Sequence, residues 1–230
     1  MNIIIIGSSG GIGRQLVSDL KESHKLFLGH HNKKPDFDYP SHQVNADDFD
    51  SLMNFVKEGK ESMRSVDALI CLTGTLILKP AHKCTEEDFN HTVNNNFKAA
   101  FSAVRASGEL LQDCAVILMS TAAASIGLAN HELISGVKSG VEGIAKSASK
   151  TYARKNLRFN TVSPGLVDTP LTSNITSNDI ILQASKKMLA LQRIGQPKDI
   201  SNMIKFLIKK ENNWITGQNF IVDGGLSSTK

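Results

Sequence analysis

The stretch IIIIGSSGGIGRQL (residues 3–16) decides the fold class of this chain. Its isoleucines form a short β-branched run that ends at a glycine, which predicts a strand buried on both faces. Apolar residues then recur at helical spacing. Gly7, Gly11 and Gly13 lie between the two elements, where they permit a tight turn and let the backbone approach a phosphate at the helix N-terminus. The spacing G-x-x-x-G-x-G favours nucleotide binding over a plain strand-to-helix turn.

Outward from this turn, strand and helix patterns alternate along the whole chain. Further strands are predicted at 24–30, 66–74, 114–121, 157–165 and 215–225, and further helices at 47–59, 85–111, 133–154 and 197–210. The first of these helices begins near Asp47 or Asp48, and the second is one or two helices that start at a Thr cap. The alternation predicts an α/β fold: a doubly wound parallel sheet of about seven strands, flanked by helices on both faces.

The chain reads as a single domain spanning residues 1–230, without a linker or an internal repeat. Its most irregular region is 168–192, which is polar and rich in turns before it becomes amphipathic. This region follows the carboxyl end of a predicted strand, where ligands bind in open α/β sheets. We therefore expect it to form a lid over the substrate site.

The composition of the chain limits the kinds of molecule that we expect it to bind. The chain has 26 Lys+Arg against 22 Asp+Glu, spread along its length, and only 6% aromatic residues, which argues against nucleic acid. The three cysteines, Cys71, Cys84 and Cys114, have no metal-like spacing and their number is odd, so a metal site and a disulfide framework are not expected. The apolar N-terminal run is too short to span a membrane and lacks a basic leader. We expect a cytoplasmic protein with a small-molecule substrate and no membrane partner.

Taken together, these motifs resemble the short-chain dehydrogenase/reductase family nearly from end to end. The matching segments are GSSGGIG (7–13), VNADD (44–48), NNNFKAAF (94–101), LMST (118–121), SPGLVDTP (163–170), RIGQPKDI (193–200) and ITGQNFIVDGG (215–225). The resemblance implies a Rossmann-type sheet, a nicotinamide dinucleotide, and hydride transfer to a carbonyl or from an alcohol. It also implies a homodimer or homotetramer in which helices near 89–112 and 134–154 pair between subunits.

The same resemblance assigns site residues. Asn96 resembles the active-site asparagine, Thr121 (preceded by Ser120) the residue that orients the substrate oxygen, and Lys138 the active-site lysine. The positions implied to contact the dinucleotide are Gly7, Ser9, Gly11, Ile12, Gly13, His30, Asn45, Ala46, Gly74, Lys138, Pro164, Gly165, Val167 and Thr169. No metal site is implied.

One position departs from the family pattern. The lysine should end a Tyr-x-x-x-Lys motif, but Ile134 stands at the tyrosine position, and isoleucine has no proton to give. The two tyrosines of the chain, Tyr39 and Tyr152, do not have the required spacing. Hydride transfer to a carbonyl leaves an alkoxide that must be protonated, so the proton source is open.

Several roles are compatible with Lys138. It can bind the ribose hydroxyls of a dinucleotide while His131 or His82 supplies the proton, or it can itself be the acid, with a pKa lowered by burial. The small residues around it also permit a purely structural role on a packed helix. Two functions follow: an oxidoreductase with a nonstandard proton donor, or a catalytically silent dinucleotide-binding relative. Reduction of an activated C=C bond is a third possibility.

The end of the second predicted strand bears on the choice of cofactor. A carboxylate that binds the ribose 2′-hydroxyl is expected there for NAD, but the segment LFLGHHNKK (26–34) has none. Its histidines and lysines favour NADP, unless HHNKK is only a solvated turn. Gly10 stands in the glycine loop where an arginine would have strengthened the case for NADP.

Overall fold

A single parallel sheet organises the molecule. The computed structural model describes residues 1–35 and 39–229. Within them, seven parallel strands lie in the order β3-β2-β1-β4-β5-β6-β7. The strands are β1 (Asn2–Ile6), β2 (Lys25–His30), β3 (Ser41–Gln43), β4 (Ala68–Cys71), β5 (Ala115–Met119), β6 (Arg158–Pro164) and β7 (Asn219–Val222). The predicted doubly wound parallel sheet is therefore confirmed.

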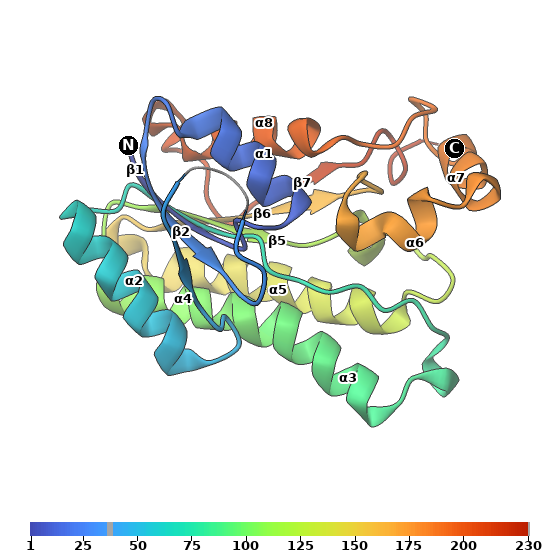
Figure 1. Ribbon diagram of the computed structural model, residues 1–230, viewed down its shortest axis with the longest axis horizontal. Coiled ribbons are helices and arrows are strands. Elements are labelled where there is room, and N and C mark those ends of the chain that lie inside the picture. Colours follow the sequence, from blue (N-terminus) through green and yellow to red (C-terminus); the bar gives the residue numbers. More distant parts are fainter. Residues whose placement is uncertain (36–38, 230) are drawn as a thin grey trace.

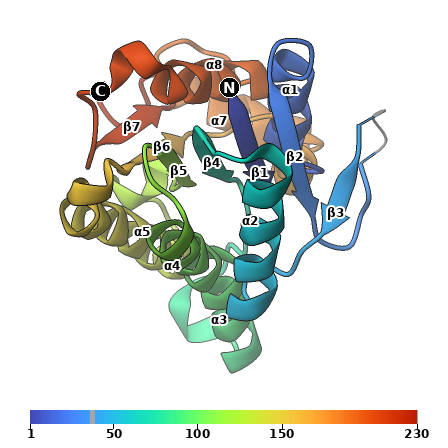
Figure 2. The same cartoon turned by 90° about the vertical axis from the view of Figure 1, so that its left-hand side faces the viewer.

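Helices cover both faces of this sheet, as Figure 2 shows. One face carries α1 (Gly11–Leu20) and α8 (Pro197–Ile208). The other face carries α2 (Phe49–Met63), α4 (Ala99–Leu110) and α5 (Glu132–Thr151). The side chain of Asp48 caps α2 by accepting a hydrogen bond from the Ser51 N–H at 2.7 Å, one of the two caps expected there.

The isoleucines of β1 pack into two apolar cores, one on each face of the sheet. Ile3 and Ile5 lie in the core with α1 and α8, whereas Ile4 and Ile6 lie in the core with α2, α4 and α5. Side chains alternate between the faces of a strand, so a central strand between two helical layers needs apolar residues at every position. This is why the run is uniformly apolar rather than alternating.

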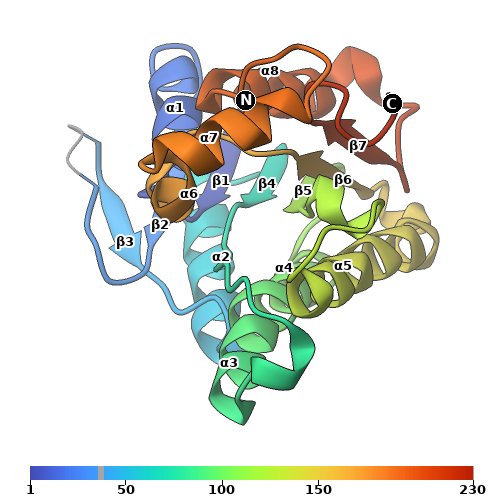
Figure 3. The ribbon, with the colours of Figure 1, turned by 90° about the vertical axis from the view of Figure 1, so that its right-hand side faces the viewer.

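The remaining helical segments are short. α3 (Glu86–Thr92) continues through a π-helical segment (Val93–Lys98) into α4. Two short helices, α6 (Ser173–Thr176) and α7 (Asp179–Lys187), make up most of the segment 168–192 and lie at one end of the molecule (Figures 1 and 3). Single 3-10 turns occupy Ala81–Lys83, Ala122–Ala124, Ala153–Lys155, Pro170–Thr172 and Lys210–Asn212. No helix in the described ranges is long and apolar enough to cross a membrane.

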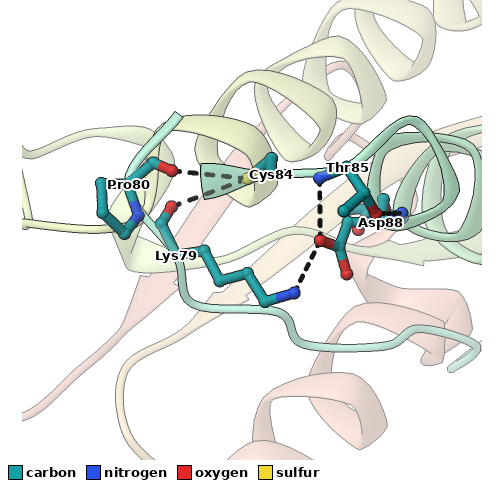
Figure 4. A network of polar contacts seen from close by, with 6 residues as sticks. Lys79, Pro80, Cys84, Thr85 and Asp88 are labelled. Atoms are coloured by element: carbon teal, nitrogen blue, oxygen red, sulfur yellow. Dashed lines mark hydrogen bonds and ion pairs between the residues drawn. The ribbon is translucent and has the colours of Figure 1, made fainter. Parts of the chain in front are cut away.

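A polar network anchors the loop between β4 and α3 (Figure 4). Thr85 and Asp88 form a capping box at the start of α3, so the predicted Thr cap is present. Lys79 pairs with the same Asp88 carboxylate at 2.6 Å. The Cys84 thiol lies 3.8 Å from the carbonyl oxygens of Lys79 and Pro80. These contacts tie the loop to the helix that leads to Asn96.

Neither β3 nor the π-helical segment was predicted. β3 is a three-residue edge strand of sequence SHQ, and its polar residues give no strand pattern; its pairing with β2 creates it. The π-helical segment interrupts what the sequence indicates as ordinary helix. Within it, the Asn96 Nδ2 donates a hydrogen bond to the Thr92 carbonyl at 2.9 Å.

Asp19 links α1 to α8 and yields a test of the packing on that face. Burial alone would raise the pKa of this carboxyl, but hydrogen bonds from Lys198, Ser201, Gln15 and Lys205 outweigh burial and lower the pKa from 3.8 to about 2. A depressed pKa stabilises the fold above the unfolded-state value, and this stability is lost as pH falls toward about 2. Asp19→Asn should therefore lower the free energy of unfolding at pH 7 by about 2 kcal/mol in urea titrations.

The matched control is Glu22→Gln, since Glu22 is highly exposed and its pairing with Lys21 is long at 3.8 Å. We expect this variant to change stability by less than about 0.5 kcal/mol. A deficit for Asp19→Asn that is as large at pH 2 as at pH 7 would contradict the electrostatic explanation.

Candidate functional site

The turn between β1 and α1 has the shape of a phosphate cradle. Gly7 has a φ of +86°, which favours glycine. A Cβ on Gly13 would lie 2.3 Å from the Gly7 carbonyl oxygen, and one on Gly11 would lie 2.8 Å from the Thr169 Cγ2. No side chain caps α1 at Gly10, and its first turn has no acid. The free N–H groups of the helix end therefore remain available to an anion, and the turn fits a pyrophosphate.

A cavity of about 450 Å³ opens beyond this turn, at the carboxyl ends of β4, β5 and β6. Its apolar lining includes Leu72, Leu76, Met119, Ala122, Leu128, Ile134, Leu166, Val167, Leu171, Ile175, Met188, Leu189 and Leu226. Polar side chains are fewer, and the candidate catalytic residues are among them. A concave apolar site with a few convergent polar groups is the usual form of a small-molecule site.

Lys138 is buried in the wall of this cavity, with 7% of its surface exposed. Its Nζ donates a hydrogen bond to the Met119 carbonyl at 2.9 Å. Burial lowers the pKa of the ammonium from 10.5 to about 8, against a smaller opposing effect of Cys71. Lys138 is thus not the surface lysine of a merely packed helix.

Asn96 is almost fully buried beside the lysine. Its Nδ2 donates to the Thr92 carbonyl at 2.9 Å, and its Oδ1 accepts from the Thr75 N–H at 3.3 Å. A Cβ on Gly74 would lie 2.7 Å from Asn96 Oδ1 and 3.3 Å from Lys138 Nζ. The bare backbone of Gly74 thus lies close to both groups, and the three positions assigned by resemblance form one corner of the cavity.

Thr121 also lines the cavity, just after β5. Its Oγ1 accepts a hydrogen bond from the Ala123 N–H at 3.3 Å, so its hydroxyl hydrogen can be offered to a substrate oxygen. Ser120 has a different role. Its Oγ donates to Glu142 Oε1 at 2.6 Å, which ties the end of β5 to α5.

Glu142 was missed by the sequence reasoning. Its Oε1 also lies 3.3 Å from Ser163 Oγ, and Ser163 donates to Asn219 Oδ1 at 2.6 Å. One carboxylate thus joins α5 to the ends of β5 and β6, and through Ser163 to β7. The available signal was its spacing, because Glu142 follows Lys138 by four positions and so shares its helix face.

The two histidines considered as proton sources are placed differently. His131 lines the cavity at the start of α5, with Nδ1 2.8 Å from the Ala129 carbonyl oxygen. His82 is exposed in the turn Ala81–Lys83 and does not line the cavity. Ile134 is buried and lines it, so a hydrocarbon side chain stands one helical turn from Lys138.

The dinucleotide positions fall into two groups. Ile12, Gly74, Lys138, Pro164, Gly165, Val167 and Thr169 line the cavity. The others lie outside it, on the glycine turn, at the end of β2 or beyond the end of β3: Gly7, Ser9, Gly11, Gly13, His30, Asn45 and Ala46. The two groups lie on either side of the boundary between β1 and β4, where the order of strands in the sheet changes direction. Dinucleotides bind at this point in doubly wound sheets.

His30 marks the outer end of this path. It is 8% exposed at the last position of β2, and its Nδ1 has no hydrogen-bond partner among the described residues. Burial lowers its pKa, and the charges of Lys34 and His42 lower it further. An unpartnered polar atom in a positive environment fits an anionic or hydroxyl group of a ligand. No cluster of metal-ligating side chains occurs in residues 1–35 and 39–229.

Comparisons with known proteins agree with this architecture. A family model described as enoyl-(acyl carrier protein) reductase matches residues 15–227. A chloroplastic tropinone reductase homolog of Arabidopsis thaliana is 26% identical over 99% of this chain and 76% of its own length. The 3-oxoacyl-(acyl-carrier-protein) reductase FabG of Staphylococcus aureus is 25% identical over 97% of this chain and 96% of its own.

Solved structures share the fold. The aldohexose dehydrogenase of Thermoplasma acidophilum superposes with a TM-score of 0.91 at 23% identity, covering 100% of this chain and 95% of that one. A short-chain dehydrogenase/reductase of Serratia marcescens superposes with a TM-score of 0.89 at 20% identity, covering 98% and 97%. With the family match extending over nearly the whole sequence, the chain belongs to the short-chain dehydrogenase/reductase family, and the relatives named above are reductases and dehydrogenases.

Proposed function

We propose that this protein is an NADP-dependent oxidoreductase that reduces a carbonyl carbon of an apolar small molecule, or oxidises the corresponding alcohol. The observation that carries the proposal is the convergence of Lys138, Asn96 and Thr121 on one apolar cavity next to a phosphate-binding turn. The bound dinucleotide would supply or accept the hydride. The apolar lining supports a hydrocarbon substrate with few polar groups.

The proposed role of Lys138 is to hold the nicotinamide ribose and to carry the proton. Ile134 leaves no phenol to do so. With a pKa near 8, the ammonium is largely protonated at neutral pH yet is a stronger acid than an ordinary lysine, so it can protonate an alkoxide. Thr121 would donate a hydrogen bond to the same oxygen. Asn96 would position the water or hydroxyl nearest Nζ.

His131 is the competing proton donor, since it too lines the cavity.

The second candidate function is that of a catalytically silent relative that binds a dinucleotide, and Ile134 is the observation that favours it. Measured turnover of a carbonyl substrate with NADPH distinguishes the oxidoreductase from the silent relative.

We also propose that residues 168–192 act as the substrate lid of a single domain. Leu171, Ile175 and Met188 from this segment line the cavity, while Ile180 on α7 is 83% exposed. A short helical segment that presents apolar side chains to the cavity is suited to closing on an apolar ligand.

The cofactor preference yields a first prediction. NADPH should bind at least about tenfold more tightly than NADH, because the end of β2 has no carboxylate to repel a 2′-phosphate and Lys34 adds positive charge near His30. Calorimetric titration with both dinucleotides measures this ratio. Lys34→Glu should shrink it, whereas the same charge change at exposed Lys57 on α2 should leave it unchanged. Equal affinities in the unaltered protein would remove the NADP assignment.

The missing phenol yields a second prediction. Ile134→Tyr should raise the rate of carbonyl reduction by about a hundredfold, because a positioned general acid contributes at least this much. Ile134→Phe is the matched control, with the ring but no hydroxyl. Stopped-flow loss of NADPH absorbance with a panel of apolar ketones and enones measures both. Equal rates in the two variants would show that the hydroxyl does nothing.

The lysine itself yields a third prediction. If Lys138 is the acid, the reduction rate of the unaltered protein falls as pH rises through about 8, because the ammonium then loses its proton. Lys138→Met should abolish turnover, and His131→Ala should retain it. The reverse pattern would assign the proton to His131. If NADPH binds but only Ile134→Tyr turns over, the silent relative is the correct reading.

The predicted homo-oligomer can be tested on an exposed aromatic pair. Phe101 on α4 is 42% exposed, its ring lies 6.1 Å from that of Phe49, and the cations of Lys98 and Arg105 lie over the Phe49 ring. We propose that this face pairs between subunits. Phe101→Asp should shift sedimentation velocity toward a smaller species, and Ile180→Asp on α7, which lies outside the helices expected to pair, serves as the exposed control. An unchanged profile would place the subunit contact elsewhere.

A further inference from the structure

The environment of Lys138 is unusual for a lysine that only binds a sugar. Its side chain is buried, lines an apolar cavity, and donates to one backbone carbonyl, that of Met119. Among the described residues, no carboxylate lies within ion-pair or hydrogen-bond distance of Nζ. The position one turn earlier on the helix, where a phenol or an acid would stabilise the charge, is Ile134.

This environment raises the share of neutral amine above that of an ordinary lysine. Burial lowers the pKa of Lys138 to about 8, so roughly a tenth of the side chains are unprotonated at pH 7. The His131 imidazole also lines this cavity, whereas the Cys71 thiol is buried near the lysine without lining it. Burial raises the pKa of this thiol, and its effect on the ammonium is smaller than that of the lysine's own burial. Lysines desolvated in this way are the ones that act as nucleophiles.

We propose that Lys138 captures an apolar aldehyde or ketone as an imine when no dinucleotide occupies the cavity. The Nζ lone pair attacks the carbonyl carbon and forms a C–N bond. The resulting carbinolamine loses its oxygen as water, which takes with it the two hydrogens that the neutral amine carried. Atoms and electrons balance without an oxidant or a reductant, and the step is reversible by hydrolysis.

The cavity supplies what this step needs. Leu72, Leu76 and Ile134 offer an apolar surface to a hydrocarbon chain and limit access of water to the imine. Thr121 lies on the same cavity and can donate a hydrogen bond to the carbinolamine oxygen. The inference goes beyond the proposed function, because it requires neither hydride transfer nor a bound dinucleotide.

The test is reductive trapping of the full-length protein. The chain is incubated with a limiting amount of octanal and sodium cyanoborohydride at pH 7, and peptide mapping by mass spectrometry locates the octyl group. Lys138 should be alkylated at least about tenfold faster than Lys146, an exposed lysine two turns further along α5, because burial lowers the pKa of Lys138 and raises its share of neutral amine. Uniform labelling of surface lysines, or none on Lys138, would overturn the proposal.

Variants sharpen the result. Lys138→Arg keeps the charge and should lose the fast label, whereas Lys146→Arg should keep it. Ile134→Tyr should slow the label, because a phenol beside Nζ favours the ammonium form. If Lys138→Arg does not fold, the distribution of octyl groups over the lysines of the unaltered protein is sufficient to test the proposal.

A parallel sample with saturating NADPH separates this inference from the proposed function. Protection of Lys138 supports both, because the ribose and the aldehyde then compete for the same amine. Fast labelling that NADPH does not reduce supports imine formation and contradicts the placement of the dinucleotide. If Lys138 labels no faster than Lys146 but NADPH still protects it, imine formation is overturned and the placement of the dinucleotide is supported.

Discussion

The contact between Gly13 and the Gly7 carbonyl is the constraint from which the site is built. With 2.3 Å between a Cβ at Gly13 and that oxygen, only glycine allows α1 to begin so close to the end of β1. This closeness brings the N-terminus of α1 to the carboxyl edge of the sheet, where the positive end of its dipole faces the crevice. Gly11 extends the constraint, because its bare backbone lets Thr169 approach from the other side of the cavity.

Much of this arrangement could be predicted from local patterns. The buried strands, the Thr85 cap and the place of Thr121 just after β5 all follow from short stretches of sequence. In a parallel sheet the carboxyl ends lie at one edge, so Thr121, Gly74 and the glycine turn were bound to meet. β3 could not be predicted, because SHQ is a strand only through its pairing with β2. The Glu142 bridge was equally hidden, since it joins residues brought together by three strands and a helix.

Asn96 shows the limit of pattern reasoning within a predicted helix. The sequence indicated a helix here and, through family resemblance, an active-site asparagine. It did not indicate that the backbone widens into a π-helix at Val93–Lys98. π-helical turns are often found at functional sites, where the extra residue re-aims a side chain. Here the widened segment carries the asparagine that bonds across to Thr75 and lies beside Lys138.

Ile134 leaves the wall of the cavity beside Lys138 apolar. Ile134 keeps the helix face apolar and buried, so α5 still packs where the family fold requires. The carboxylate of Glu142 binds Ser120 and lies close to Ser163, holding the ends of β5 and β6 to that helix independently of position 134. The helix is therefore held in place without a polar side chain at position 134, and Lys138 lies buried with the Met119 carbonyl as its hydrogen-bond partner. Burial of that lysine lowers its pKa to about 8, so its ammonium is a stronger acid, and its neutral amine more abundant, than in an ordinary exposed lysine.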